Sequence, residues 1–262
     1  MDVKFVINTC KGFSDESVPI LIQSLLKNNI NNQAIVVIEG GHNERKQTEK
    51  YGCLCIETDN NSFDLTAMID IAEHEIKSDY WFYLHDTVIV GNKFKPLLED
   101  KLSKLKSLPD AVALYFNGMN GSSMNMGLYK YDYIASKKDL LLSRKNKNYT
   151  KDGLKEYKIQ AINDEDLLLW QSEIRSSLSY FCRPEKRKSP PDNFESLNNI
   201  DGVNLDVVNN EPLNNEPLFK PYKNSKAERL MEHYEDIDLY KFKSNFGANN
   251  PEGKAEMMVI TL

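Results

Sequence analysis

The sequence predicts an α/β fold built on a mainly parallel sheet. Over the first half of the chain, short apolar segments rich in β-branched and aromatic residues alternate with segments of helical periodicity. The apolar segments are hydrophobic almost throughout, which is typical of strands covered on both faces. Strands that alternate with helices in this way favour a parallel sheet with helices on both sides.

Five strands are expected from the short apolar runs. Their ranges and sequences are 3–9 (VKFVINT), 34–41 (AIVVIEGG), 53–58 (CLCIET), 80–86 (YWFYLHD) and 111–116 (AVALYF). Each run has the length of an ordinary strand and lies near glycine or polar residues that end it.

Helices are expected between these strands. The segment 14–29 (SDESVPILIQSLLKNN) has Ser14 as a possible N-cap and places Val18, Leu21 and Leu25 on one face. The segment 62–78 (SFDLTAMIDIAEHEIKS) is the clearest amphipathic helix, and 94–107 (FKPLLEDKLSKLKS) repeats the pattern.

The periodicity weakens after residue 120. A turn at Asn163 is expected to precede a helix, residues 183–224 are rich in Pro, Asn and Lys and are expected to form a long loop, and 225–242 is expected to return to helix. We therefore expect one domain over residues 1–262, with 1–180 as its core and 181–262 as a C-terminal loop and helical extension.

Composition excludes several classes of protein. A net charge of −6 disfavours a nucleic-acid-binding protein, which needs a basic face. The four cysteines form no CxxC or Cys/His pattern, so structural zinc is disfavoured and a reducing compartment is favoured. The N-terminus is not typical of a signal peptide, and no apolar run approaches the length of a transmembrane helix. A soluble, cytoplasmic protein without a transmembrane segment is expected.

Polar residues follow the predicted strands at the points where they end. They are Thr9 and Cys10, Glu39, residues 57–59, and His85 with Asp86. Ligands of parallel sheets collect at the carboxyl ends of the strands, so these residues are expected to lie on one rim. The sequence lacks GxGxxG, P-loop, GxSxG and HExxH motifs, and so lacks the signatures of dinucleotide-binding proteins, P-loop NTPases, serine hydrolases and zincins.

Two acidic positions have both a functional and a structural interpretation. A carboxylate at a strand end, such as Asp86, suits an Mg²⁺ or Mn²⁺ ion, but it also suits the capping of the next turn. In the segment 164–166 (DED), acids at a helix start complement the helix dipole, and one of them is also able to serve as a general base.

The order of these features resembles the GT-A fold of nucleotide-sugar glycosyltransferases of the family 2 type, over roughly residues 1–180. The segment 84–87 (LHDT) occupies the place of that family's DXD motif, with Asp86 as its only acid. The resemblance implies that Thr9, Cys10 and Glu39 contact the nucleoside, that His85 and Asp86 contact the diphosphate, and that Gly127 lines the donor sugar.

The same resemblance implies the remaining site residues. Asp86 and His233 would hold Mn²⁺ or Mg²⁺, and Asp64 would belong to the donor site. Asp166 would be the catalytic base, with Glu165 as its neighbour. The arginine that family members often carry in the helix after the third strand has no counterpart here.

The resemblance predicts metal-assisted transfer of a sugar from a UDP- or GDP-linked donor to a hydroxyl of a glycan or glycoprotein. One alternative is a non-catalytic nucleotide-sugar-binding protein, in which the missing acid has removed turnover. Another is a sugar-phosphate nucleotidyltransferase, which would need a glycine-rich, basic loop after the first strand, where only Lys11 and Gly12 are found.

Overall fold

The structure is a computed structural model that describes residues 2–11, 14–105, 109–115, 126–147, 153, 156–157, 179–188 and 230–242. Eight strands of these residues form one large sheet in the order β3-β4-β2-β1-β5-β8-β7-β9. Their bounds are β1 (Val3–Cys10), β2 (Ile35–Gly40), β3 (Lys46–Lys50), β4 (Cys53–Thr58), β5 (Tyr80–His85), β7 (Ala111–Tyr115), β8 (Gly127–Lys130) and β9 (Ser179–Cys182).

The large sheet is mainly parallel, as predicted. Strands β4, β2, β1 and β5 run parallel to one another, and β7 runs parallel to β9. Strand β8 is antiparallel to both of its neighbours, β5 and β7, and β3 is antiparallel to β4. The β3 strand was not predicted, because its sequence KQTEK is polar and mostly exposed, as suits a sheet edge.

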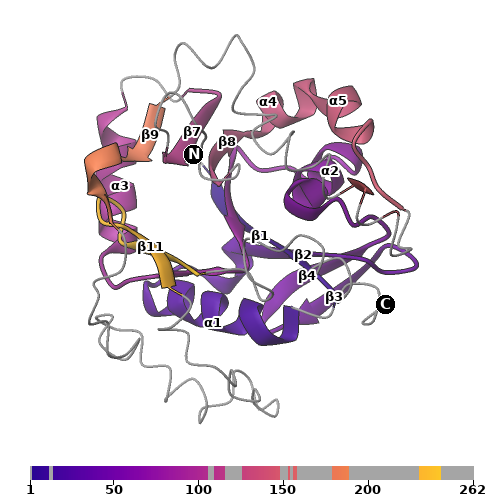
Figure 1. Ribbon diagram of the computed structural model, residues 1–262, viewed down its shortest axis with the longest axis horizontal. Coiled ribbons are helices and arrows are strands. Elements are labelled where there is room, and N and C mark those ends of the chain that lie inside the picture. The colour runs from indigo at the N-terminus through magenta and orange to yellow at the C-terminus, as the bar shows by residue number, and fades with distance from the viewer. Residues whose placement is uncertain are drawn as a thin grey trace.

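Helices cover both faces of this sheet (Figure 1). Helix α1 (Ser14–Lys27) lies on one side, whereas α2 (Thr66–Glu73), α4 (Tyr131–Ser136) and α5 (Lys138–Leu142) lie together on the other. Helix α3 (Phe94–Lys104) follows β6 (Val88–Val90), and the short 3-10 helices are η1 (Asn32–Ala34), η2 (Phe63–Leu65) and η3 (Pro184–Lys186). No helix in the described part of the chain has the length and apolar character needed to cross a membrane.

Aromatic side chains join α3 to the centre of the sheet. The ring of Phe82 on β5 lies 5.6 Å from that of Phe5, 5.7 Å from that of Phe94 and 5.4 Å from that of Phe181. All four rings are buried, and tilted or edge-on pairs at these distances stabilise a core beyond their buried area. This cluster fixes β5 against β1, β9 and α3. The end of β5 carries His85, Asp86 and Thr87, which we call the HDT segment.

A second sheet has the order β10-β11-β12-β6, with β6 (Val88–Val90), β10 (Arg187–Lys188), β11 (Leu230–Tyr234) and β12 (Leu239–Phe242). The helix predicted for residues 225–242 is therefore wrong where the structure describes it, because residues 230–242 form a β-hairpin. Asp238 has a φ of 50°, which ends any helix, and its backbone oxygen accepts a bond of 2.8 Å from Gly91 N.

The hairpin also explains a glycine. A Cβ atom at Gly91 would lie 2.2 Å from Asp238 Oδ2, and the same carboxylate accepts a hydrogen bond of 2.9 Å from Lys93 N. The turn of the hairpin is thus held against the start of α3. As a result, β12 pairs with β6, which begins two residues after Asp86.

Candidate functional site

The ends of neighbouring strands in the large sheet lie in register with one another. Thr9 pairs in register with Glu39, and Glu39 pairs with Glu57, while Asn8 pairs with His85 on the other side of β1. The predicted convergence of these residues on one rim is therefore confirmed by the register of the parallel strands. We use the name strand-end site for Thr9, Ser17, Asp64, His85 and Asp86.

Asp86 is held by hydroxyl groups from two other elements. Its Oδ2 accepts a hydrogen bond of 2.7 Å from Thr9 Oγ1 on β1 and one of 2.8 Å from Ser17 Oγ in α1. Its backbone N–H donates to the carbonyl oxygen of Asn8 at 3.1 Å. These contacts fix the direction of the Asp86 carboxylate, which is partly exposed at the end of β5. The interpretation of Asp86 as a cap of the next turn did not predict contacts with β1 and α1.

His85 and Asp64 form the other half of the strand-end site. His85 Nε2 lies 3.7 Å from Asp64 Oδ1, and the ring of His85 meets that of Tyr83 edge-on with centroids 5.5 Å apart. The hydroxyl of Tyr83 donates to the backbone oxygen of Asp64. Two residues that were each predicted for the donor site thus lie side by side, and their contact with a donor stays a prediction.

The short helix η2, which carries Asp64, has an unusual backbone. Phe63 has a φ of 49°, a region that a bulky side chain seldom adopts, and Asn8 Nδ2 donates to its oxygen at 3.0 Å. Asn8 Oδ1 accepts from Ala67 N at 2.8 Å, so one buried amide holds both ends of the turn. Conformations of this kind gather at binding sites, where the surroundings hold them in place.

Glu39 is engaged in a buried network rather than open at the rim. Its carboxylate accepts a hydrogen bond of 2.7 Å from Lys50 Nζ and contacts His42 Nε2 at 3.1 Å. His42 Nδ1 lies 3.2 Å from Glu57 Oε2, so the imidazole bridges the ends of β2 and β4. Burial alone would raise the pKa of Glu39, but the bonds from His42 and Lys50 outweigh it and lower that pKa to about 2.

Cys10 and Gly127 have structural roles beside their predicted ones. Cys10 is buried at the end of β1. Gly127 has a φ of 149°, and a Cβ atom there would lie 2.1 Å from the oxygen of Val112 on β7. The close approach that marks Gly127 is thus an approach to a neighbouring strand, and its contact with a donor sugar stays a prediction.

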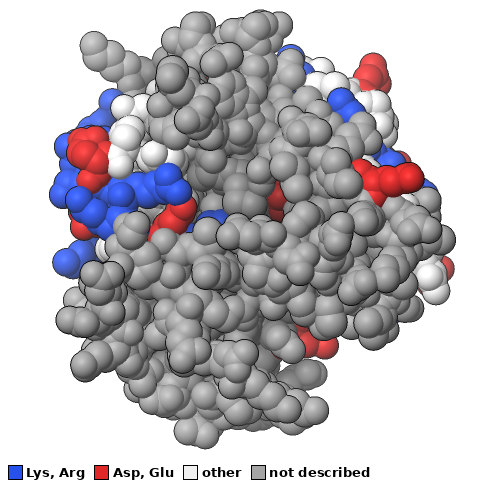
Figure 2. Space-filling view, viewed as in Figure 1, with Lys and Arg blue, Asp and Glu red and all other residues white. Residues whose placement is uncertain are grey.

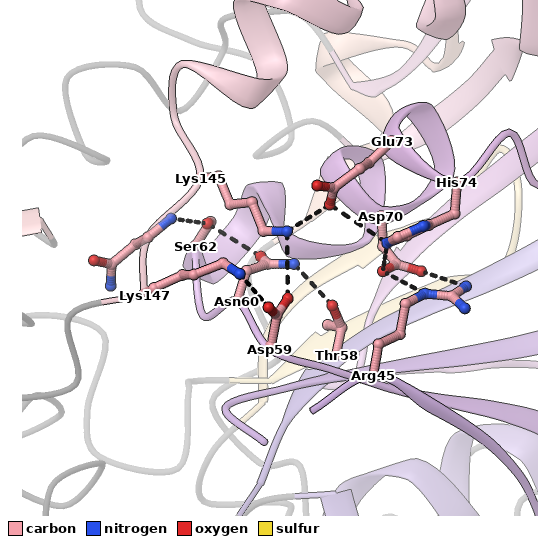
Figure 3. A network of polar contacts seen from close by, with 11 residues as sticks. Arg45, Thr58, Asp59, Asn60, Ser62, Asp70, Glu73, His74, Lys145 and Lys147 are labelled. Atoms are coloured by element: carbon pink, nitrogen blue, oxygen red, sulfur yellow. Dashed lines mark hydrogen bonds and ion pairs between the residues drawn. The ribbon is translucent and has the colours of Figure 1, made fainter. Parts of the chain in front are cut away.

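A polar network braces the rim beyond β4 (Figure 3). Lys145, from the segment after α5, contacts Asp59 at 3.3 Å and Glu73 of α2 at 2.5 Å, and Lys147 also contacts Asp59. Burial alone would raise the pKa of Asp59, but the bonds from Lys147 and Lys145 lower it. This network ties the loop before Asp64 to two helices.

The second sheet places His233 and Lys241 differently with respect to Asp86. His233 stacks on Tyr240 with centroids 4.0 Å apart and lies 3.3 Å from Asp238. Strand β12 separates it from β6, which corresponds to about 10 Å between the backbones of His233 and Ile89. Lys241 pairs directly with Val88, and its Nζ donates to Thr87 Oγ1 at 3.1 Å.

Sequence reasoning missed Ser17 and Lys241. Ser17 lies one turn into the predicted helix, where a serine is ordinary, and only the fold brings it to Asp86. Lys241 gave no signal, because its segment was assigned to a helix. Glu165 and Asp166, the predicted catalytic pair, lie outside the described residues.

A metal ion at the strand end needs more ligands than the described residues supply. Among them, no group of three or more His, Cys, Asp and Glu side chains is arranged to hold a metal ion. Asp86 is the acid of the HDT segment, and its Oδ2 already accepts two hydroxyl protons. The described side chains alone therefore do not fit the expected Mn²⁺ or Mg²⁺ site.

Exposed Lys and Arg side chains gather on a different part of the surface from the strand-end site. In Figure 2, Lys and Arg side chains cluster at the left of the molecule, over the segment coloured orange in Figure 1, which contains η3 and β10. Arg183 is paired with Asp236 at 2.7 Å, and Lys186 with Glu235 at 3.2 Å. These charges are balanced by acids of the β11–β12 hairpin.

The likeness of the chain to known proteins is distant. No family model matches the chain, and no curated protein matches it. Among solved structures, residues 1–349 of TarS from S. aureus are similar with 11% sequence identity and a TM-score of 0.31. The match covers 63% of this chain and 69% of that one. At this TM-score the likeness decides neither activity nor substrate, which rest on the residues of the site.

Proposed function

We propose that this protein is a glycosyltransferase that moves a sugar from a UDP- or GDP-linked donor to a hydroxyl group of a glycan or glycoprotein. The observation that carries the proposal is the position of Asp86 at the carboxyl end of a parallel strand, held by Thr9 and Ser17. Ligands of parallel sheets bind at such ends, and the resemblance of the sequence gives the class of ligand.

The proposed division of labour follows the strand ends. The diphosphate would lie over the end of β5 at His85 and Asp86, and the nucleoside over the ends of β1 and β2. Since Glu39 is bound to Lys50 and His42, we expect those two side chains to share in nucleoside recognition. As part of the same proposal, residues 1–180 form the nucleotide-sugar-binding core and residues 181–262 form an extension on the acceptor side.

The reaction exchanges one bond for another at the sugar. The acceptor oxygen bonds to the anomeric carbon, the bond from that carbon to the diphosphate breaks, and the acceptor proton passes to a carboxylate. Asp166, beside Glu165, is the proposed recipient of that proton. Participation of Mn²⁺ or Mg²⁺ stays a prediction, and each assay below is therefore run with and without these ions.

Two other functions make different predictions. A non-catalytic binding protein would bind the same nucleotide sugars but release no nucleoside diphosphate from them. A nucleotidyltransferase would bind nucleoside triphosphates and sugar phosphates. The strand-end site is compatible with ligand binding by a glycosyltransferase, a non-catalytic binding protein and a nucleotidyltransferase. A measurement of turnover therefore distinguishes these three functions.

Binding is tested first by thermal denaturation with UDP, GDP, UDP-sugars and GDP-sugars. A ligand at about 100 times its Kd adds about 2.7 kcal/mol of stability, which raises the Tm by several degrees. The wild type and an Asp132→Asn control are expected to show this shift, because the Asp132 side chain is 76% exposed on α4. Asp86→Asn is expected to lose most of it. The absence of any shift in the wild type would overturn the proposal.

A further inference from the structure

The position of Asp64 in the strand-end site depends on the shape of η2, the short helix that carries it. Phe63, the first residue of η2, has a φ of 49°. A bulky side chain keeps this backbone conformation when the surrounding structure holds it there. The contacts around Phe63 and Asp64 therefore show what sets the direction of the Asp64 carboxylate.

Two strands of the large sheet hold the backbone of η2. Asn8 on β1 lies in register with His85 on β5, and its Nδ2 donates a hydrogen bond of 3.0 Å to the oxygen of Phe63. The hydroxyl of Tyr83, also on β5, donates to the backbone oxygen of Asp64. These bonds join η2 to the two strands whose ends form the strand-end site.

Tyr157 holds the side chain of Phe63. The two rings are stacked, with centroids 5.9 Å apart and planes inclined by 11°. Phe63 is buried and Tyr157 is partly exposed, and the Tyr157 hydroxyl donates a hydrogen bond of 2.6 Å to the oxygen of Arg144. Stacked aromatic pairs stabilise a structure beyond the area they bury. Tyr157 thus packs on the residue of η2 that has the unfavourable backbone conformation.

The segment that anchors Tyr157 is itself bound to the loop before η2. Asn146 N donates a hydrogen bond of 2.9 Å to Ser62 Oγ, and Asn146 Nδ2 donates one of 3.0 Å to the oxygen of Asn61. Arg144, which accepts the bond from Tyr157, lies two residues before Asn146. The Tyr157 ring is therefore held over Phe63 by chain that is fixed to the same loop.

We propose that Tyr157 is a positioning residue of the donor site, which keeps η2 in the shape that places Asp64 beside His85. This proposal rests on the proposed function, because Asp64 and His85 are two of its predicted donor contacts. Asp64 Oδ1 lies 3.7 Å from His85 Nε2, so a movement of η2 changes the distance between the two groups. Functional sites are sensitive to displacements of about 1 Å, and loss of the Phe63–Tyr157 stack is expected to weaken donor binding about tenfold.

The first test is calorimetric titration of UDP and of GDP, each with Mg²⁺ and with EDTA. The wild type is expected to bind one of them, and Tyr157→Leu to bind it about tenfold more weakly. Tyr157→Phe keeps the ring and is expected to bind within about threefold of the wild type. Tyr131→Leu is the matched control and is expected to stay within about twofold. Tyr131 is also a partly exposed tyrosine, but its N–H donates to the oxygen of Asp79, before the start of β5 and at the opposite end of that strand from His85.

A second pair of variants shows whether Tyr157 acts through Asp64. In a protein that carries Asp64→Asn, the further change Tyr157→Leu is expected to weaken binding by less than about twofold, since residues that act as a unit are not additive. A further loss of about tenfold would overturn the proposal, because Tyr157 would then act by another route. Binding by Tyr157→Leu within about twofold of the wild type would also overturn it, as would a Tyr157→Phe variant as weak as Tyr157→Leu.

A measurement without ligand separates this proposal from the proposed function. In NMR spectra of ring-labelled histidine, with the His85 signal assigned by His85→Gln, Tyr157→Leu is expected to shift that signal, as Asp64→Asn does. Tyr131→Leu is expected to leave it in place. An unchanged His85 signal in Tyr157→Leu would overturn the proposal, and binding of UDP or GDP by the wild type would leave the proposed function standing. A wild type that binds neither UDP nor GDP in either condition would overturn the proposed function itself.

Discussion

The hydroxyl of Thr9 donates a hydrogen bond of 2.7 Å to the carboxylate of Asp86, across the ends of two neighbouring parallel strands. Ser17 donates to the same oxygen from the first turns of α1. The consecutive elements β1 and α1 thus meet at a carboxylate that lies at least 69 residues later in the sequence. This arrangement gives Asp86 a fixed direction, which a bound ligand requires.

Thr9→Val is expected to lower the free energy of unfolding by about 1.5 kcal/mol, because it removes a hydrogen bond to a charged group and keeps the shape of the side chain. Ser17→Ala is expected to have a similar effect. The double variant is expected to lose less than the sum, since both hydroxyls share one acceptor atom. Urea denaturation measures all three. A Thr9→Val variant as stable as the wild type would contradict this.

Arg45→Met is expected to destabilise the fold by about 3 kcal/mol, because it leaves a buried carboxylate without its main partner. Asp70 is fully buried, and Arg45 binds both of its oxygens, at 3.1 Å and 3.2 Å (Figure 3). Adding Asp70→Asn is expected to recover part of the loss.

Arg183→Met is the matched control for this change. Arg183 also binds both oxygens of an acid, Asp236, but its side chain is 54% exposed. Its loss is expected to cost less than about 1 kcal/mol. Equal effects of the two arginine substitutions in chemical denaturation would show that burial of Asp70 does not matter.

Glu39 is expected to make stability depend on pH in acid. Its pKa is lowered from 4.5 to about 2 in the folded protein, so its contribution is fully present above about pH 4.5 and is lost as the pH falls towards 2. The difference in unfolding free energy between the wild type and Glu39→Gln should therefore shrink over that range. A difference that is constant from pH 6 to the lowest pH at which the protein folds would contradict the low pKa.

Gly127→Ala is expected to destabilise the sheet by more than about 2 kcal/mol. The new Cβ atom would overlap the oxygen of Val112, and the φ of 149° is unfavourable for alanine. The measurement is the urea midpoint. A midpoint like that of the wild type would show that β8 moves away from β7 without cost, and would leave Gly127 explained by its proposed donor contact alone.

Much of the fold followed from local patterns. The strands of the first half of the chain were predictable because continuous apolar runs such as YWFYLH admit few other structures inside an α/β sheet. The exposed β3 strand carries no such pattern. The β11–β12 hairpin was missed because Leu230, Tyr234 and Ile237 are spaced as on a helix, and only the pairing with β6 and the contact of Asp238 with Gly91 decide for strands.

The site was predictable to the extent that it lies at strand ends. Thr9, Glu39, His85 and Asp86 could be placed on one rim because parallel strands end at the same edge. Ser17 and Lys241 could not be placed there, since their contacts with Asp86 and Thr87 depend on how α1 and the second sheet pack. The network that occupies Glu39 was missed for the same reason, because Lys50 lies on the unpredicted β3 strand.

Release of nucleoside diphosphate from UDP- and GDP-sugars, in the presence of a panel of glycan and glycoprotein acceptors, tests the central proposal most directly. The wild type is expected to release UDP or GDP together with a glycosylated acceptor, and Asp86→Asn to do so about 100-fold more slowly while remaining folded. An Asp86→Asn protein that transfers sugar at the wild-type rate, or a wild type that binds a nucleotide sugar and releases no diphosphate with any acceptor, would contradict it.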